Sequence, residues 1–175
     1  MVGDERAQSE AAFDDLSRPR SAGEPQWPPV AARIRQARER LGLSLSSIAE
    51  NLGLEVSEYQ DVEFHDDEVF TNFSAKHLRA LGEILSLPLH EILFGPNAEP
   101  VLVTTSSSEI ARLISEMATA RQLSLDELSN VVGWELEPIV RDPARLADLN
   151  LDGLRSVCNA VDIDWVSALL EKETG

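Results

Sequence analysis

An internal repeat constrains the fold of this chain more than any other feature. Eleven residues with the pattern Leu-Ser-Leu-x-x-apolar-small-x-x-apolar-Gly begin at Leu43 and recur, 80 positions later, from Leu123. Beyond this motif the apolar positions still correspond, but the offset falls to 76, so that Leu78 corresponds to Leu154. Such a repeat predicts one structural unit present twice, with a loop four residues shorter in the second copy.

The spacing of apolar residues predicts that this unit is helical. The first helix is expected to end at Gly42 and to turn four apolar residues inward: Val30, Ile34, Ala37 and Leu41. Serine caps and glycine ends place the next helix between Ser44 and Gly53. The remaining expectations are a helix over Val56–Phe64, a loop over His65–Ser74, a helix that turns Leu78, Leu81, Ile84 and Leu85 inward, and a short helix from Pro88 to Gly95.

The composition divides the chain into four segments. Residues 1–29 are rich in acids and prolines and poor in apolar residues, so we expect a disordered tail. Residues 30–95 hold the first unit, residues 96–107 a linker, and residues 108–175 the second unit, with Ser108 as its first helix cap. The expected fold class is all-α, with two tandem five-helix units.

The chain is strongly acidic, with 31 Asp and Glu against 15 Lys and Arg and a formal charge of -16. This charge repels phosphate backbones and favours basic partners. The start of the chain has no signal-peptide pattern, and no apolar stretch is long enough to span a membrane, so we expect a cytoplasmic protein. The single cysteine, Cys158, is expected to be a small core residue in a reducing compartment.

The first copy carries a wider pattern of residues. It reads Ile34-Arg35-x-x-Arg38-x-x-x-Gly42-Leu43-Ser44-x-x-x-Ile48-Ala49-x-x-Leu52-Gly53, then Tyr59-x-x-Val62-Glu63, and closes with Leu81-x-x-Ile84-Leu85-x-Leu87-Pro88-Leu89-x-Glu91-Ile92-Leu93. This pattern resembles the Cro/C-repressor (XRE-type) helix-turn-helix family over about residues 30–95, and the second copy resembles it in degenerate form. The resemblance implies two tandem five-helix repressor-like helix-turn-helix domains.

The resemblance also implies which residues would contact DNA. In the family the second helix of the motif lies in the major groove, and its exposed side chains contact bases. Here that helix offers Ser57 and Gln60 as base contacts, while Arg35 and Arg38 on the first helix are candidates for phosphate contacts. The arginines have an alternative interpretation, in which they form salt bridges with nearby acids.

Other residues in this region point to a protein partner instead. Residues 55–69 hold seven acids and no Lys or Arg, and Leu45 stands where the family has a phosphate-contacting glutamine. Val56, and Leu136 in the second copy, are apolar where the family has a polar residue, which indicates burial or a protein contact. The candidates for a partner surface are Glu55, Val56, Glu58, Asp61, Asp66, Asp67 and Glu68.

The sequence contains no catalytic or metal-binding motif. His65 stands beside three acids, but a zinc site needs three or four converging His or Cys ligands, so an exposed acidic loop is the better interpretation. The chain has no Gly-rich phosphate loop, no GxSxG motif and no His-Glu-x-x-His motif. We therefore expect no enzymatic activity, no metal and no cofactor.

Three functions remain open. We favour a non-enzymatic helix-turn-helix regulator that acts through a protein partner, either antitoxin-like or with an acidic surface that mimics DNA. The alternative is an XRE-type transcriptional regulator that binds operator DNA through the first domain. The third function is that of a structural or oligomerisation subunit, because the repeat and the apolar residues Val56 and Leu136 suggest packed domains or a homodimer.

Overall fold

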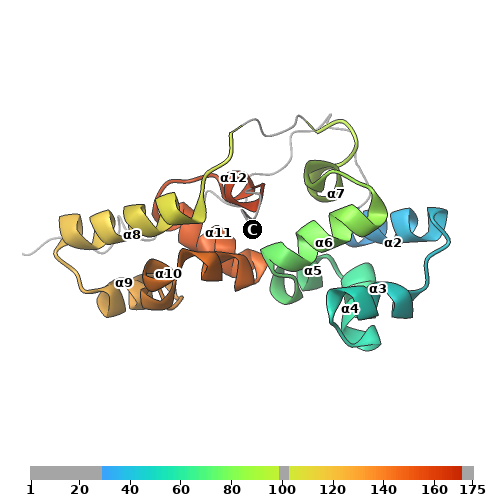
Figure 1. Ribbon diagram of the computed structural model, residues 1–175, viewed down its shortest axis with the longest axis horizontal. Helices are drawn as coiled ribbons and strands as arrows, with labels where there is room; N and C mark the ends of the chain where they lie inside the picture. Colours follow the sequence, from blue (N-terminus) through green and yellow to red (C-terminus); the bar gives the residue numbers. More distant parts are fainter. Residues whose placement is uncertain (1–28, 99–102, 171–175) are drawn as a thin grey trace, which may run out of the picture.

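The fold is all-α over the residues that the computed structural model describes, 29–98 and 103–170 (Figure 1). The first half, residues 29–98, contains α2 (Val30–Arg40), α3 (Leu45–Leu52), α4 (Val56–Phe64), α5 (Asp66–Asn72), α6 (Ala75–Leu85) and α7 (Leu89–Phe94). The second half, residues 103–170, contains α8 (Ser107–Arg121), α9 (Leu125–Val132), α10 (Glu137–Arg141), the 3-10 helix η2 (Pro143–Asp148), α11 (Leu151–Ala160) and α12 (Trp165–Leu169). The expected all-α class is confirmed. The tail expected over residues 1–29 lies, apart from Pro29, outside the described residues.

The two copies of the repeated motif fold into the same local structure. Ser44 Oγ accepts a hydrogen bond from the backbone N–H three residues later (3.1 Å), and Gly53 ends α3 with a φ of +70°. In the second copy Ser124 Oγ accepts the equivalent bond (3.2 Å), and Gly133 ends α9 with a φ of +82°. Glycine adopts a positive φ at little cost because it has no Cβ. The helix ends predicted from Ser44 and Gly53 are confirmed, as are the bounds of α4.

The segment between His65 and Ser74 is a helix, α5, so the loop expected there is wrong and the first half has six helices instead of five. Three acids lie in the first turn of α5, where the helix dipole is positive and stabilises negative charge. Val69 and Phe73 are fully buried and hold the segment against the core. The segment has three apolar residues, Val69, Phe70 and Phe73, which span little more than one helical turn and are too few to distinguish a helix from a loop by period.

Two further boundaries differ from the predictions. Helix α8 starts earlier than expected because Ser106, not Ser108, caps it: Ser106 Oγ accepts a hydrogen bond from Glu109 N over 3.1 Å. Leu41, expected on the buried face of the first helix, is 50% exposed because α2 ends at Arg40 and the chain turns there. The other three residues predicted for that face are buried.

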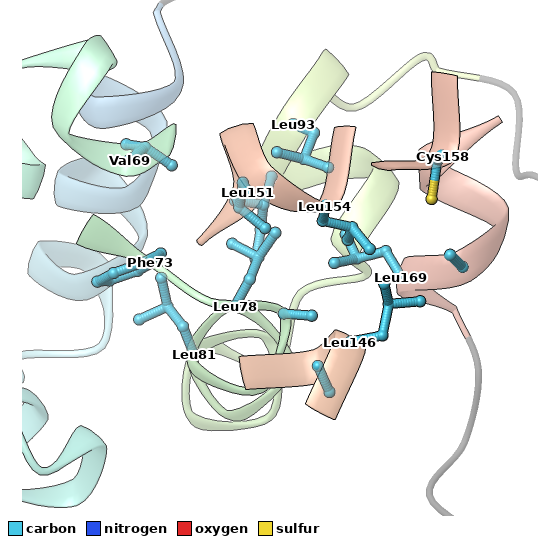
Figure 2. Packing of buried hydrophobic residues seen from close by; sticks show 14 of the residues in the cluster. Val69, Phe73, Leu78, Leu81, Leu93, Leu146, Leu151, Leu154, Cys158 and Leu169 are labelled. Carbon is cyan, nitrogen blue, oxygen red and sulfur yellow. The ribbon is translucent and has the colours of Figure 1, made fainter. Parts of the chain in front are cut away.

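One hydrophobic core runs through both halves, as Figure 2 shows. Leu78 of α6 packs in this core together with Leu151 and Leu154 of α11, and each is at most 1% exposed. Cys158 is fully buried in the same core, which confirms its interpretation as a small core residue. Because burial of apolar surface is the main favourable term in folding, each half is stabilised by covering the other.

Backbone hydrogen bonds also join the halves. Ser74 and Asn150, the N-cap residues of α6 and α11, pair as an isolated antiparallel β-bridge. Leu151 N donates a hydrogen bond to Phe73 O over 2.8 Å, and Asn150 Nδ2 donates one to Thr71 O over 2.8 Å. These bonds satisfy backbone groups that helix ends would otherwise leave unpaired.

Helix α6 contacts the second half through two basic side chains. Arg79 Nε donates a hydrogen bond to Leu169 O over 2.8 Å, and Arg79 Nη2 donates one to Ala168 O over 3.1 Å, at the end of α12. A cation is favourable there because the last carbonyls of a helix carry partial negative charge. Lys76 Nζ lies 2.6 Å from Asp148 Oδ1, an exposed ion pair that contributes little to stability but fits the same contact.

Because the core is shared, damage to the first half is expected to destabilise the second. Phe73→Ala removes a fully buried ring and is expected to lower the free energy of unfolding by about 3–5 kcal/mol. Urea unfolding is followed by far-UV circular dichroism and by the fluorescence of Trp134 and Trp165 in a Trp27→Phe background, and both signals should shift to the same lower midpoint. Phe94→Ala, at a position that is 47% exposed, is the control. Separate transitions in the two signals would contradict a shared core.

Candidate functional site

Helix α4 is the second helix of the first repeated motif, and the turn at Gly53 sets its position. Glu55 N donates a hydrogen bond to Glu58 Oε2 over 2.9 Å, so the side chain of Glu58 satisfies a backbone group just before the helix. Tyr59 and Val62 are fully buried against the core. The opposite side of α4 therefore faces outward.

The outward side of α4 carries most of the residues predicted to bind a ligand. We call this surface the α4 face, and its exposed residues are Glu55, Val56, Ser57, Glu58, Gln60, Asp61 and Phe64. Val56 and Phe64 are 43% and 57% exposed, so apolar groups lie among the carboxylates. Burial, one of the two interpretations of the apolar residue at position 56, is therefore wrong for Val56, and a protein contact stays a prediction. Its counterpart in the second copy, Leu136, is 1% exposed and therefore buried.

Arg38, one of the expected phosphate contacts, is bound within the protein. Its Nε and Nη2 donate hydrogen bonds to the two carboxylate oxygens of Glu63 over 2.6 and 2.7 Å, and its Nη1 donates one to Leu43 O over 3.0 Å. The side chains of Arg38 and Glu63 are 13% and 1% exposed. The hydrogen bond to Glu63 raises the pKa of Arg38. For this arginine the structure shows the salt bridge that the sequence left as an alternative.

Arg35 lies at the edge of the α4 face. Its guanidinium carbon is 5.6 Å from the centre of the Phe64 ring, a distance at which the cation is attracted to the ring face. Arg35 is half-buried. The structure thus brings Arg35 against Phe64 at the end of α4, whereas Arg38 points toward Glu63.

Glu63 is an important residue whose own role was not apparent from the sequence, although it belongs to the repressor-type pattern and is one of the seven acids of residues 55–69. A signal for it exists, because it follows Tyr59 by four positions and therefore lies on the buried side of α4. The Tyr59 hydroxyl is buried beside this ion pair and has no hydrogen-bond partner among the described residues. Burial first, and the Glu63 carboxylate second, raise the pKa of the Tyr59 phenol.

The acids that follow α4 divide between structural and exposed roles. Asp66 Oδ1 accepts a hydrogen bond from Ala31 N over 2.8 Å, so it caps the start of α2. Glu68 Oε2 accepts one from Asn72 Nδ2 over 2.7 Å within α5. Asp67 is exposed. Of these three partner candidates, two are held in contacts within the chain.

The second repeated motif also presents acids. Over the described residues 44–65 and 124–142, nine carboxylates are exposed and Arg141 is the single Lys or Arg. Arg141 Nη2 lies 2.5 Å from Glu137 Oε1, so part of its charge is neutralised locally. The α3–α4 pair and the α9–α10 pair lie on the same, lower side of the molecule in Figure 1. The nine acids are Glu50, Glu55, Glu58, Asp61, Asp126, Glu127, Glu135, Glu137 and Asp142.

The rest of the described chain shows no arrangement for metal chemistry. Among these residues no group of three or more His, Cys, Asp and Glu side chains is placed to hold a metal ion. None of the helices over 29–98 and 103–170 is long and apolar enough to cross a membrane. Trp134 and Trp165 pack against the core, at positions that correspond to Leu54 and Leu89 of the first copy.

A groove lies between the ends of α6, α7 and α12. Its volume is about 970 Å³, and Leu87, Leu89 and Leu169 line it together with Arg79. The sequence could not show this groove, because its walls come from segments that are far apart along the chain.

Comparison with known proteins leaves the site without an assignment. No family model matches this chain, and no solved structure matches it. The resemblance to the repressor family therefore stays a prediction that rests on the residues of the chain itself.

Each member of the buried ion pair is expected to be costly to the fold without the other. Arg38→Met leaves the Glu63 carboxylate buried without its partner and is expected to lower the free energy of unfolding by about 3–5 kcal/mol. Adding Glu63→Met removes that charge, so the double variant should recover most of the loss. Urea unfolding measures both, with Arg40→Met at an exposed position as the control. A loss for Arg38→Met as small as for this control would rule out the buried pair.

The buried thiol provides an independent check of the second half. Burial raises the pKa of Cys158 to about 12, and the thiolate is the reactive form. We therefore expect no reaction with an aromatic disulfide reagent at about pH 8 in the native protein, and complete reaction in urea. By the same shift, the neutral thiol stabilises the folded state up to about pH 8.5, and this contribution is lost as the pH rises through about 12. Rapid labelling of the native protein would show that Cys158 is accessible.

Proposed function

We propose that this protein is a non-enzymatic helix-turn-helix regulator that acts by binding a protein partner with a basic surface. The observation that carries the proposal is the charge of the two motifs, where nine exposed carboxylates accompany one arginine. An antitoxin-like protein, or a protein that mimics DNA, would present such a surface to its partner.

The scaffold that we propose is a duplicated repressor-type domain. The equivalent caps of Ser44 and Ser124 and the equivalent turns at Gly53 and Gly133 support it. The elements also follow one another in the same order in both halves, with the 3-10 helix η2 in the place of α5. Helix α10 has five residues where α4 has nine, which agrees with the fall of the sequence offset from 80 to 76.

Electrostatics argue against duplex DNA as the ligand of the α4 face. DNA carries one negative charge per about 1.7 Å of helix axis, so carboxylates in the major groove face phosphates on both sides. Arg38 already donates hydrogen bonds to Glu63 and does not offset this repulsion. A basic protein is instead attracted by each carboxylate, and the exposed Val56 and Phe64 supply the apolar contact found at the centre of protein interfaces.

The exposure of Ser57 and Gln60 favours one alternative, an XRE-type regulator that binds operator DNA through the first half. Both side chains carry hydrogen-bond donors and acceptors that can contact base edges. This alternative predicts affinity for duplex DNA that falls steeply with salt, because phosphate contacts release counterions.

Fluorescence anisotropy with a labelled arginine-rich peptide and a labelled DNA duplex tests the proposal on the full chain. We expect peptide binding at about 50 mM salt that weakens at about 200 mM, and no binding of duplex DNA. Glu58→Gln combined with Asp61→Asn should weaken peptide binding roughly 2- to 30-fold, since each exposed ion pair contributes about 0.2–1 kcal/mol. Glutamine at position 58 keeps the acceptor for Glu55 N.

A matched control removes the same charge elsewhere. Glu83→Gln with Asp162→Asn changes two exposed carboxylates outside the motifs and should leave peptide binding almost unchanged. If this control weakens binding as much as the α4 variant does, the peptide responds to net charge alone and the proposed surface is wrong. Salt-sensitive DNA binding that disappears in Ser57→Ala with Gln60→Ala would establish the alternative function.

A further inference from the structure

The residues that meet at the centre of the contact between the halves are equivalents of each other in the repeat. Ser74 pairs with Asn150 in the antiparallel bridge, and the two are 76 positions apart, which is the offset that relates the later parts of the two copies. Each is the N-cap of its helix, Ser74 for α6 and Asn150 for α11. The bridge therefore joins one point of the first copy to the same point of the second.

Pairing between equivalent residues is a property of a twofold axis. In a symmetric dimer a residue contacts a different residue of the partner everywhere except at the axis, where it meets its own copy. Leu151 follows Asn150 in the chain, and Phe73 precedes Ser74. The backbone hydrogen bond from Leu151 N to Phe73 O (2.8 Å) is therefore one that an antiparallel pairing of Ser74 with Asn150 requires. The two acidic helix pairs lie on one side of the molecule in Figure 1, which agrees with an axis between α6 and α11.

We propose that residues 70–79, the end of α5 and the start of α6, form a self-complementary pairing surface that the second half covers within the same chain. The partner that this surface fits is a second copy of itself. One chain then carries both subunits of a dimer, each with its own acidic motif. This inference rests on the duplication proposed above and is independent of the proposed basic partner.

Side-chain contacts explain why the two halves of one chain pair in preference to two first halves. Lys76 Nζ lies 2.6 Å from Asp148 Oδ1, and the Phe70 ring meets the Trp165 ring edge-on with 6.3 Å between centroids. In a pair of first halves, Asn72 would stand at the position of Asp148 and a leucine at the position of Trp165. The ion pair and the ring contact would both be absent, so self-pairing is the weaker of the two associations.

The first test joins the two bridge residues in the full chain. Ser74→Cys with Asn150→Cys places thiols on directly opposed residues, and the Cα spacing of an antiparallel pair suits a disulfide. A protease site replaces residues 99–102, so that the halves can be separated after oxidation. We expect the cut halves to remain linked until reduction, whereas the cut parent chain, in which Cys158 is buried, shows no link. Unlinked halves in the double variant would overturn the bridge and the proposal with it.

The second test asks whether the surface pairs with its own copy. The cut Ser74→Cys protein is unfolded in urea with reductant, refolded so that the halves can exchange partners, and then oxidised. A residue at a twofold axis meets its copy, so we expect disulfide-linked pairs of first halves in about tenfold or greater excess over Ser57→Cys, whose thiol is on the α4 face. Equal yields from the two variants would show that the surface is not self-complementary.

A third variant keeps the helix cap at Ser74, in case its loss prevents refolding. Thr71→Cys is exposed at the end of α5, and the backbone O of Thr71 accepts a hydrogen bond from Asn150 Nδ2. A short bis-maleimide should link two first halves of this variant after exchange, and the same yield from Ser57→Cys would overturn the proposal. Because no basic peptide takes part in these experiments, their failure leaves the test of the proposed partner unaffected.

Discussion

The apolar contact that α5 and α6 of the first half make with α11 and η2 of the second is the constraint on which the rest of the structure depends. A domain of about 60 residues buries only about 60% of the surface that its unfolded chain exposes, so it is marginally stable alone. Leu78 and Leu81 on one side, and Leu151 and Leu154 on the other, are almost completely removed from water where the halves meet. This burial holds the two halves together through one core. Because α4 and α10 pack on that core, it also fixes the direction in which their exposed sides face.

The carbonyls at the ends of α7 and α12 accept hydrogen bonds in both copies, but from arginines at different positions. In the first half Arg33 Nε donates a hydrogen bond to Ile92 O over 2.8 Å and so pairs a carbonyl at the end of α7. The position equivalent to Arg33 in the second copy is Leu113, which cannot donate, and the end of α12 is instead capped by Arg79 from the first half. The second half therefore depends on the first for a contact that the first half makes by itself.

Local structure was predictable from the sequence, and long-range contacts were not. The cap at Ser44 and the turn at Gly53 depend on residues a few positions apart, so the pattern located α3 and α4 correctly. Helix α5 was missed because its apolar residues, Val69, Phe70 and Phe73, cover too short a run to establish a helical period, and packing against the distant helices α2 and α11 holds the segment in place. The role of Arg38 was left open for the same reason, since its partner Glu63 is 25 positions away and only the crossing of α2 and α4 brings them together.

The net charge of -16 matters less to ligand choice than the distribution of charge does. At physiological ionic strength charges are screened over about 8 Å, so a ligand on the α4 face responds mainly to the carboxylates of that face and its neighbours. Residues 44–65 include no Lys or Arg, and Arg35, over the Phe64 ring at the edge of this face, offsets the carboxylates only in part. The fixed core places a second acidic helix pair on the same side of the molecule. A ligand with two basic patches that reach both acidic helix pairs binds more tightly than a ligand that reaches one, because its second contact forms at high effective concentration. A phosphate backbone is repelled at both pairs, so the position of two acidic pairs on one core supports the basic partner that we propose over DNA.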